Sequence, residues 1–305
     1  MFEQIKTTDF DMFSEVQEGW ETNYLPLQPE KFEAVLQLAQ INGLQTEIEW
    51  LKNQTEIYGA STSTGLGIVL PFGKQSEFMS KGCRVGEGDV NVFKPGEEIY
   101  AVMNPGTILV SYSIDLEVFD EFSSFVDVAD LQEIFQSSSV IKSSNNINLA
   151  LHKYANRILR LASKGTVSNL VYDQLVLEVI SELAQAVTTT RKPTLSNAKR
   201  YKIAKAARDL IVDHLAPHPT ILELCSLLNI SQRTLEYAFR SVYAVSPKKF
   251  IKTKRLIAVH KDLKGSTRDR RISDVAMNYG FSELGYFARD YRAMFGELPS
   301  DTLRN

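Results

Sequence analysis

One stretch of the chain reads Ile221-Leu-Glu-Leu-Cys-Ser-Leu-Leu-Asn-Ile-Ser231, and a second reads Ile272-Ser-Asp-Val-Ala-Met-Asn-Tyr-Gly-Phe-Ser282. Each is a short apolar segment that ends on a serine able to cap a following helix. Apolar residues then recur at matching positions, which are Leu235, Phe239, Tyr243 and Pro247 in the first copy and Phe287, Tyr291, Phe295 and Pro299 in the second. A short helix, a tight turn and a second helix, present twice, predict two helix-turn-helix units.

The residues between the two units predict one continuous helix. Ser246 can cap its first turn, Pro247 suits its first position, and the helical pattern continues to Gly265. Such a helix fixes the distance between the two units. Because successive major grooves on one face of DNA lie about 34 Å apart, two units held in this way indicate a DNA-binding domain.

Charge divides the chain into two unlike parts. The 305 residues include 34 Lys and Arg against 37 Asp and Glu, a net charge of -3. Residues 196–305 hold 20 of the basic and 11 of the acidic residues, a net +9, which leaves 14 against 26, a net -12, for the rest. A basic C-terminal part favours nucleic-acid binding. We therefore expect an N-terminal domain over residues 1–190, a linker over 191–198 and a double helix-turn-helix domain over 199–305.

The N-terminal part has the pattern of a β domain. Alternating segments such as Phe32–Leu38 and Leu44–Leu51 are separated by turn signals such as Pro95-Gly96. Many short strands of this kind suggest a barrel or jelly roll. The fold class expected for the whole chain is α+β, with an all-α C-terminal domain.

Two helices are predicted after the strands, at about 147–163 and 168–187, beyond a polar linker at 136–146. The second helix places Val176, Ile180, Leu183 and Val187 on one stripe, flanked by further apolar residues. So wide an apolar surface suggests two partners, the barrel and a second subunit. We expect a homodimer formed through this helix, and packing within one chain is the alternative.

Several function classes are disfavoured. The two cysteines, Cys83 and Cys225, exclude a disulfide framework and a Cys-rich zinc site. No nucleophile, base and orienting acid form a recognisable set, and Ser61–Gly67 lacks the Gly-Lys-Ser/Thr of a phosphate-binding loop. No signal peptide is evident, and no segment approaches the ~18 apolar residues of a membrane span. We expect a cytoplasmic protein that is not an enzyme.

The second helix in each helix-turn-helix unit is the one that enters a groove of DNA, and it is called the reader from here on. The outward side chains of the two readers are candidates for base contacts. Arginine can bond guanine bidentately, glutamate can accept from cytosine, and an apolar side chain can meet the thymine methyl group, each good pair being worth ~1–3 kcal/mol. Lysines of the joining helix suit phosphates, which position a protein without specifying sequence. The candidates are Ser231, Gln232, Arg233, Glu236 and Tyr237 in the first unit, Leu284, Gly285, Tyr286 and Arg289 in the second, and Lys248, Lys249, Lys252 and Lys254 in the joining helix. Ordinary solvated side chains are the alternative for each.

The double helix-turn-helix, with Arg255-Leu256 in the joining helix, Tyr279-Gly280-Phe281 before the second reader and the ending Phe295-Gly296-Glu-Leu-Pro299, resembles the AraC/XylS family of bacterial transcription regulators. The segment Gly88–Glu97 resembles the strand-turn-strand piece of a cupin, which implies a cupin-like barrel. Ala276–Tyr291 looks closest to the branch that contains the ethanolamine-operon regulator, which raises ethanolamine and cobalamin as candidate signals. Neither composition nor spacing supports them independently.

Two departures from the family pattern concern a metal and a turn. The four histidines, His152, His214, His218 and His260, all lie outside the predicted barrel, so we expect no metal site and no cofactor there. Ala244 replaces the glycine that is usual after the first reader.

The resemblance implies a regulator, more commonly an activator, that binds promoter DNA and RNA polymerase and responds to a small effector. Trp50, Tyr58, Phe93 and Tyr100 are the aromatic residues expected to line the effector pocket, with a role as core filler as the alternative. Two other functions remain open: a regulator whose barrel only dimerises or binds protein, and an enzyme with a DNA-binding tail.

Overall fold

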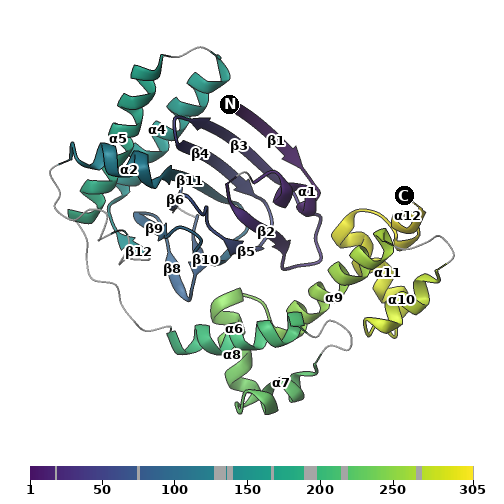
Figure 1. Ribbon diagram of the computed structural model, residues 1–305. Helices are drawn as coiled ribbons and strands as arrows, with labels where there is room; N and C mark the ends of the chain where they lie inside the picture. Colours follow the sequence, from purple (N-terminus) through teal and green to yellow (C-terminus); the bar gives the residue numbers. More distant parts are fainter. Residues whose placement is uncertain are drawn as a thin grey trace. The chain divides into compact units, whose positions relative to one another are not determined.

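The computed structural model describes residues 1–17, 19–73, 76–126, 135, 140–165, 168–188, 198–213, 219–265 and 270–304. The chain forms two compact units (Figure 1). The first consists of Met1–Leu25 and Glu33–Leu195, and the second of Pro26–Phe32 and Ser196–Asn305. The short segment Pro26–Phe32 therefore belongs with the C-terminal unit, although it lies between two strands of the first unit in the sequence.

Two antiparallel sheets form the core of the first unit. In the described residues, the seven-stranded sheet has the order β1 (Phe2–Thr7), β3 (Ala34–Ile41), β4 (Leu44–Leu51), β11 (Thr107–Asp115), β6 (Gly65–Pro71), β9 (Asp89–Phe93) and β12 (Val140–Lys142). The five-stranded sheet has the order β2 (Glu21–Pro26), β5 (Thr55–Ala60), β10 (Glu98–Met103), β7 (Phe78–Ser80) and β8 (Cys83–Val85). A short helix, α1 (Phe10–Glu15), precedes β2.

The expected strand at Leu44–Leu51 is confirmed as β4, but the prediction of a closed barrel is wrong. Each sheet keeps its own edges, β1 and β12 in one and β2 and β8 in the other. Alternation within a strand predicts which residues share a face, and it carries no information on which strand lies at an edge. The α+β class holds, with two separate sheets in place of a barrel.

Helices cover one face of the seven-stranded sheet (Figure 1). They are α2 (Leu116–Ser123), α4 (Asn145–Ser163) and α5 (Asn169–Thr188), so both predicted helices are confirmed. The predicted stripe of α5 is buried within the unit, with Val176, Ile180 and Leu183 at most 1% exposed. Packing inside one chain accounts for this stripe, which therefore does not require a second subunit.

Both predicted linkers fall largely outside the described residues. Of the linker at 136–146, residues 136–139 are not described, whereas 140–142 form β12 and α4 begins at Asn145. Of the linker at 191–198, the structure describes only Ala198, where α6 (Ala198–Asp213) begins.

Within the described part of residues 198–304, the C-terminal unit consists of helices joined by turns and short loops. After α6 it contains α7 (Ile221–Leu227), α8 (Gln232–Tyr243), α9 (Pro247–Lys264), α10 (Ile272–Asn278), α11 (Leu284–Phe295) and α12 (Pro299–Arg304). Helices α7 and α8 form the first helix-turn-helix, α10 and α11 form the second, and α9 joins them (Figure 1). In the described residues of the chain, no helix is long and apolar enough to cross a membrane.

Helix caps explain where α8 and α9 begin. The Ser231 hydroxyl accepts a hydrogen bond from the Thr234 amide at 3.1 Å, and Ser246 does the same for Lys249 at the start of α9. The prediction that Ser282 caps the matching helix of the second helix-turn-helix, α11, is wrong. Glu283 occupies the cap position of α11 and makes no side-chain capping bond, so this helix begins one residue later than the repeat implies.

Aromatic packing fixes the joining helix, α9, to both helix-turn-helix units. On one side, Phe250 of α9 packs edge-on against Phe239 with their rings 5.4 Å apart, and Tyr243 stacks on it at 5.3 Å. Towards the other end of α9, His260 Nδ1 lies 2.7 Å from the Tyr291 hydroxyl of α11. These buried contacts make α9 a fixed spacer between the two readers.

Candidate nucleic-acid interface

Helix α8 separates its apolar and polar residues onto two faces. Leu235, Ala238 and Phe239 are at most 1% exposed, because they pack into the C-terminal core. The predicted base-contacting residues lie on the other face, with Ser231, Gln232, Arg233 and Tyr237 exposed and Glu236 half-buried. Arg233, Thr234, Glu236, Tyr237 and Arg240 together line an open surface depression of about 550 Å³.

The charged residues on this face differ in whether they already form an ion pair within the protein. The Glu236 carboxylate accepts a hydrogen bond from Arg240 Nε at 2.9 Å, four residues along the helix. In the described structure no carboxylate pairs with Arg233, so its guanidinium is available for an acceptor-rich base edge. Arg240 was absent from the predicted base contacts, although its place one turn after Glu236 is a signal for this pairing.

The second reader, α11, exposes a less polar surface. Phe287 and Tyr291 are buried, whereas the predicted residues Leu284, Gly285, Tyr286 and Arg289 are exposed. The Arg289 guanidinium lies 4.9 Å from the centre of the Tyr286 ring and 3.7 Å from the Asp290 carboxylate. Its charge therefore already has two partners on its own helix.

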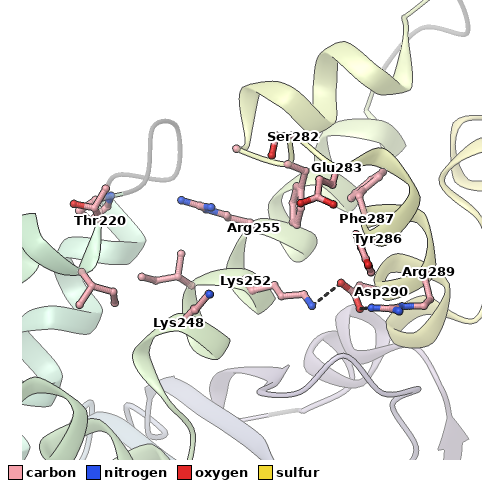
Figure 2. Close-up of a pocket in the computed structure, with 15 residues that line it drawn as sticks. Thr220, Lys248, Lys252, Arg255, Ser282, Glu283, Tyr286, Phe287, Arg289 and Asp290 are labelled. Atoms are coloured by element: carbon pink, nitrogen blue, oxygen red, sulfur yellow. Dashed lines mark ion pairs between the residues drawn. The ribbon is translucent and has the colours of Figure 1, made fainter. Parts of the chain in front are cut away.

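A groove of about 710 Å³ runs between the two helix-turn-helix units, across α9 (Figure 2). Thr220 before α7, Lys248 and Arg255 of α9, and Tyr286 and Asp290 of α11 are among the residues that line it. Figure 2 shows Lys252 extended towards Asp290, with its Nζ 2.5 Å from the carboxylate. This ion pair connects the joining helix to the second reader.

Arg255 was absent from the predicted DNA contacts, and the structure places it in this groove. Its side chain lies against Gly280, where an added Cβ would come within 3.1 Å of the guanidinium. Burial lowers the pKa of Arg255 from its ordinary value, and its buried Nε has no hydrogen-bond partner. A half-buried cation with unused donor capacity suits a phosphate oxygen.

The four lysines of α9 fall into different environments. Lys248 is exposed, whereas Lys249 Nζ donates to the Gln28 side-chain oxygen at 2.7 Å and Lys252 pairs with Asp290. For Lys254, the interpretation as phosphate-attracting charge and its alternative, a solvated side chain, both require exposure and are wrong. Lys254 is 5% exposed, and its ammonium lies 5.0 Å above the Phe250 ring, because this side of α9 faces the core.

A cavity of about 40 Å³ lies between the two sheets of the first unit. Of the four aromatic residues expected in an effector pocket, Phe93 lines it, whereas Trp50, Tyr58 and Tyr100 do not. Side chains alternate along a strand, so Trp50 lies on the opposite face of β4 from its cavity-lining neighbour Glu49. Tyr58 and Tyr100 are register partners that alternate in the same way with Ile57 and Ile99, which line the cavity.

The histidines that the structure describes have packing partners. His152 stacks on Phe72 with ring centres 3.4 Å apart, and burial lowers its pKa from the ordinary value. His260 stacks on Phe295 at 4.0 Å. His214 and His218 lie outside the described residues. Among the residues described, no cluster of three or more His, Cys, Asp or Glu could hold a metal ion.

Comparisons with known proteins support the assignment of the C-terminal region. Residues 224–305 match the model of a helix-turn-helix domain family. The XylDLEGF operon transcriptional activator of Pseudomonas putida is 38% identical over 95 residues, which cover 31% of this chain and 30% of that protein. The regulator ExsA of Pseudomonas aeruginosa is 43% identical over 67 residues, which cover 22% of this chain and 23% of that protein.

Among solved structures, the AraC-like transcriptional activator CuxR aligns over 84% of this chain and 94% of its own, with 13% identity and a TM-score of 0.45. The chain spans about a third of the length of the curated relatives it matches. The family model supports a helix-turn-helix domain over residues 224–305, and the curated relatives that match this region are transcriptional regulators. The assignment to the ethanolamine-operon branch stays a prediction.

Proposed function

We propose that this protein is a sequence-specific DNA-binding transcriptional regulator, acting as an activator, whose N-terminal unit binds a small effector. The observation that carries the proposal is the pair of helix-turn-helix units joined by α9, each with a buried apolar face and an exposed reader face. The two readers enter successive major grooves. Contacts to RNA polymerase and a homodimeric state are parts of the same proposal.

The two readers have unequal roles in this proposal. Helix α8 offers Gln232 and Arg233 at its exposed first turn, so it specifies the base sequence. In α11 the exposed first turn offers Leu284 and Gly285, and Arg289 is held by Asp290 and Tyr286. The second reader therefore contributes more to docking and to shape readout, with Leu284 as a contact for a thymine methyl group.

Arg255 and Lys248 hold the DNA backbone between the two readers. Both line the groove across α9, and both carry positive charge. Contacts of this kind raise the affinity for every sequence alike, and they position the reader helices in the grooves.

Substitution of Arg233 by alanine tests the base-reading role. The cognate site is first selected from random DNA with the unchanged protein, and the affinities for that site and for random DNA are then measured. Loss of a bidentate arginine–guanine contact costs ~1–3 kcal/mol, or about 5- to 150-fold, on the selected site, with a much smaller change on random DNA. Arg160→Ala, an exposed arginine of α4, is the matched control and leaves both affinities unchanged. Equal losses on both DNAs would contradict the proposed role of Arg233.

Base-pair exchanges test the unequal roles of the readers. Exchanges beneath α8 are expected to lower the affinity more than exchanges beneath α11, because α8 exposes the richer set of hydrogen-bonding side chains. Greater sensitivity beneath α11 would overturn this assignment.

In the alternative function the N-terminal unit binds no small effector and only dimerises or binds protein. The cavity between the sheets has mainly apolar and aromatic walls with a few buried polar side chains, which favours a small ligand. A thermal-shift screen of small metabolites on the whole chain, alongside its mass in solution, separates the two functions.

A further inference from the structure

Helix α6 packs against the first reader, α8, although it belongs to neither helix-turn-helix unit (Figure 1). Arg200, Ala204, Ala207 and Ile211 follow one another along α6 at intervals of four, three and four residues, so they share one face of the helix. The last three are fully buried. Arg200 continues the buried face towards the N-terminal end of α6, which places its side chain at the edge of the contact with the first reader.

Tyr237 of α8 meets Arg200 at this edge. The central carbon of the Arg200 guanidinium lies 4.7 Å from the centre of the Tyr237 ring, close enough for the ring to attract the cation. The ring itself is 57% exposed. Tyr237 lies four residues after Arg233 and three before Arg240, so these three side chains share the outer face of the reader. The stacked pair therefore borders the face that is directed at DNA.

The charge around this pair favours an anion. Arg233, Glu236 and Arg240 are the charged residues that line the depression on α8, and Arg200 lies over its tyrosine, which gives a net charge of +2. The Glu236 carboxylate is already paired with Arg240. A guanidinium stacked on a ring contacts it with its flat face, and its N–H groups point outwards in the plane of the group. Donors in this arrangement match the oxygens of a phosphate.

The dimensions of DNA place a phosphate strand beside the first reader. The major groove is about 12 Å wide, so each bordering backbone lies about 6 Å from the axis of a helix centred in the groove. The axes of two packed helices lie about 8–10 Å apart. A helix packed beside the reader therefore lies over the bordering backbone and not inside the groove. With α8 in the major groove, Arg200 is within reach of that backbone.

We propose that Arg200 and Tyr237 form a phosphate-binding site for the DNA backbone at the edge of the first reader. The Arg200 guanidinium donates to a phosphate oxygen, and Tyr237 is a positioning residue that holds the guanidinium against α8. This role differs from the base contact that the sequence predicts for Tyr237. It also extends the DNA-binding surface to α6, which precedes the residues 224–305 that match the family model. The inference rests on the proposed function, because it requires α8 to lie in a groove.

The test compares Arg200→Ala with Lys202→Ala in the whole chain, on the selected site and on random DNA. Lys202 is exposed and lies about 200° around α6 from Arg200, so this control removes the same charge from the opposite face. Arg200→Ala is expected to lower the affinity for both DNAs alike, by about 2- to 10-fold, because one hydrogen bond to the backbone is lost.

Titrations at several salt concentrations measure the charge contact itself. Loss of one phosphate contact reduces the slope of log affinity against log salt concentration by about 0.9. The advantage of the unchanged protein over Arg200→Ala is therefore expected to shrink about 3-fold between about 50 and 200 mM salt. Lys202→Ala is expected to keep the slope of the unchanged protein.

Variants of Tyr237 separate positioning from base reading. Tyr237→Phe retains the ring and is expected to bind both DNAs as the unchanged protein does. Tyr237→Ala removes the surface beneath Arg200 and is expected to weaken binding to both DNAs by a similar factor. In an Arg200→Ala background the same substitution is expected to add little, because the contact that it supports is already lost. A loss confined to the selected site would identify a base contact and overturn the positioning role.

The outcomes for Arg200 decide the phosphate site. An unchanged salt slope in Arg200→Ala, an equal reduction in Lys202→Ala, or a loss of affinity on the selected site alone overturns the proposal. If Arg200→Ala fails to fold, Arg200→Gln carries the same test, because glutamine removes the charge and keeps a side chain that can cover the ring.

Failure of the phosphate site is distinguishable from failure of the proposed function. Specific DNA binding by the unchanged protein, together with an unchanged salt slope in the Arg200 variant, rejects the phosphate site and leaves the DNA-binding regulator standing. Absence of specific DNA binding by the unchanged protein rejects the proposed function, and the phosphate site with it.

Discussion

The Glu47–Glu49 pair is expected to make the first unit less stable as the pH rises above about 5. In the unfolded chain these carboxyl groups have a pKa of about 4.5, whereas burial raises the pKa of Glu49 to about 7 in the folded protein and also raises the pKa of Glu47. Between these pH values the folded state holds protons that the unfolded state has released. The stabilisation is fully present below the unfolded pKa and is lost as the pH rises through the folded pKa.

The size of this effect follows from the pKa of Glu49. A rise from 4.5 to about 7, at about 1.4 kcal/mol for each pH unit, gives about 3 kcal/mol between pH 5 and pH 8. For a unit of this size, 1 kcal/mol changes the melting temperature by about 2–4 °C, so the melting temperature is expected to fall by about 6–12 °C. Burial lowers the pKa of His152, which acts in the opposite direction, so the effect has to be measured against a variant.

The assay is thermal unfolding followed by tryptophan fluorescence at pH 5 and pH 8, since both tryptophans lie in the first unit. The double variant Glu47→Gln and Glu49→Gln is expected to lose most of the fall in melting temperature, whereas Glu117→Gln, at an exposed glutamate of α2, retains it. An equal fall in the double variant and the unchanged protein would refute the assignment of this pH dependence to the pair.

Two further predictions concern the C-terminal unit. Lys248→Ala is expected to reduce the slope of log affinity against log salt concentration by about 0.9, because the exposed ammonium no longer displaces a counterion from one phosphate. DNA titrations at several salt concentrations measure this slope. An unchanged slope contradicts the contact between Lys248 and a phosphate. Ala244 and Gly296 end α8 and α11 with backbone φ angles of 52° and 78°, in the left-handed region that favours glycine. Ala244→Gly is therefore expected to stabilise the C-terminal unit by up to about 1 kcal/mol, and Gly296→Ala to destabilise it by about 1 kcal/mol. Denaturant titrations measure both changes, and effects of the same sign would contradict the role of backbone conformation.

The C-terminal unit was largely predictable because its signals are local. Ser231 and Ser246 cap helices where the sequence indicates, and the apolar positions of α8 and α11 form its core. The predictions that failed concern residues whose surroundings are set by contacts between helices. Lys254 follows the same charged run as Lys248, yet its place on α9 turns it towards Phe250. Ser282 is in the right place in the repeat, but the backbone makes Glu283 the cap.

The cavity was not predictable from the sequence because β4 is covered on both faces. Gln45, Glu47 and Glu49 alternate with Thr46, Ile48 and Trp50, and an alternation of this kind ordinarily indicates that the polar face is solvated. This reasoning gives Trp50 an inward position and leaves the glutamates in water. In the structure the glutamates face the second sheet, while the face that carries Ile48 packs against the helices. Because β4 lies between a second sheet on one face and helices on the other, its polar face is buried, whereas a sheet covered on one face alone would leave that face in water.

The chain itself connects the cavity to the helix between the two readers. Strand β2 carries Tyr24, the hydrogen-bond partner of Glu49, and ends at Pro26, where the segment that folds with the C-terminal unit begins. Within that segment the Leu27 carbonyl accepts from the Thr253 hydroxyl of α9 at 3.3 Å, and Gln28 accepts from Lys249. Only Leu25 and Pro26 separate Tyr24 from Leu27 in the sequence. Under the proposed function an effector acts by binding one conformation better than another, and this covalent path is the route that we propose from the cavity to the helix that joins the readers.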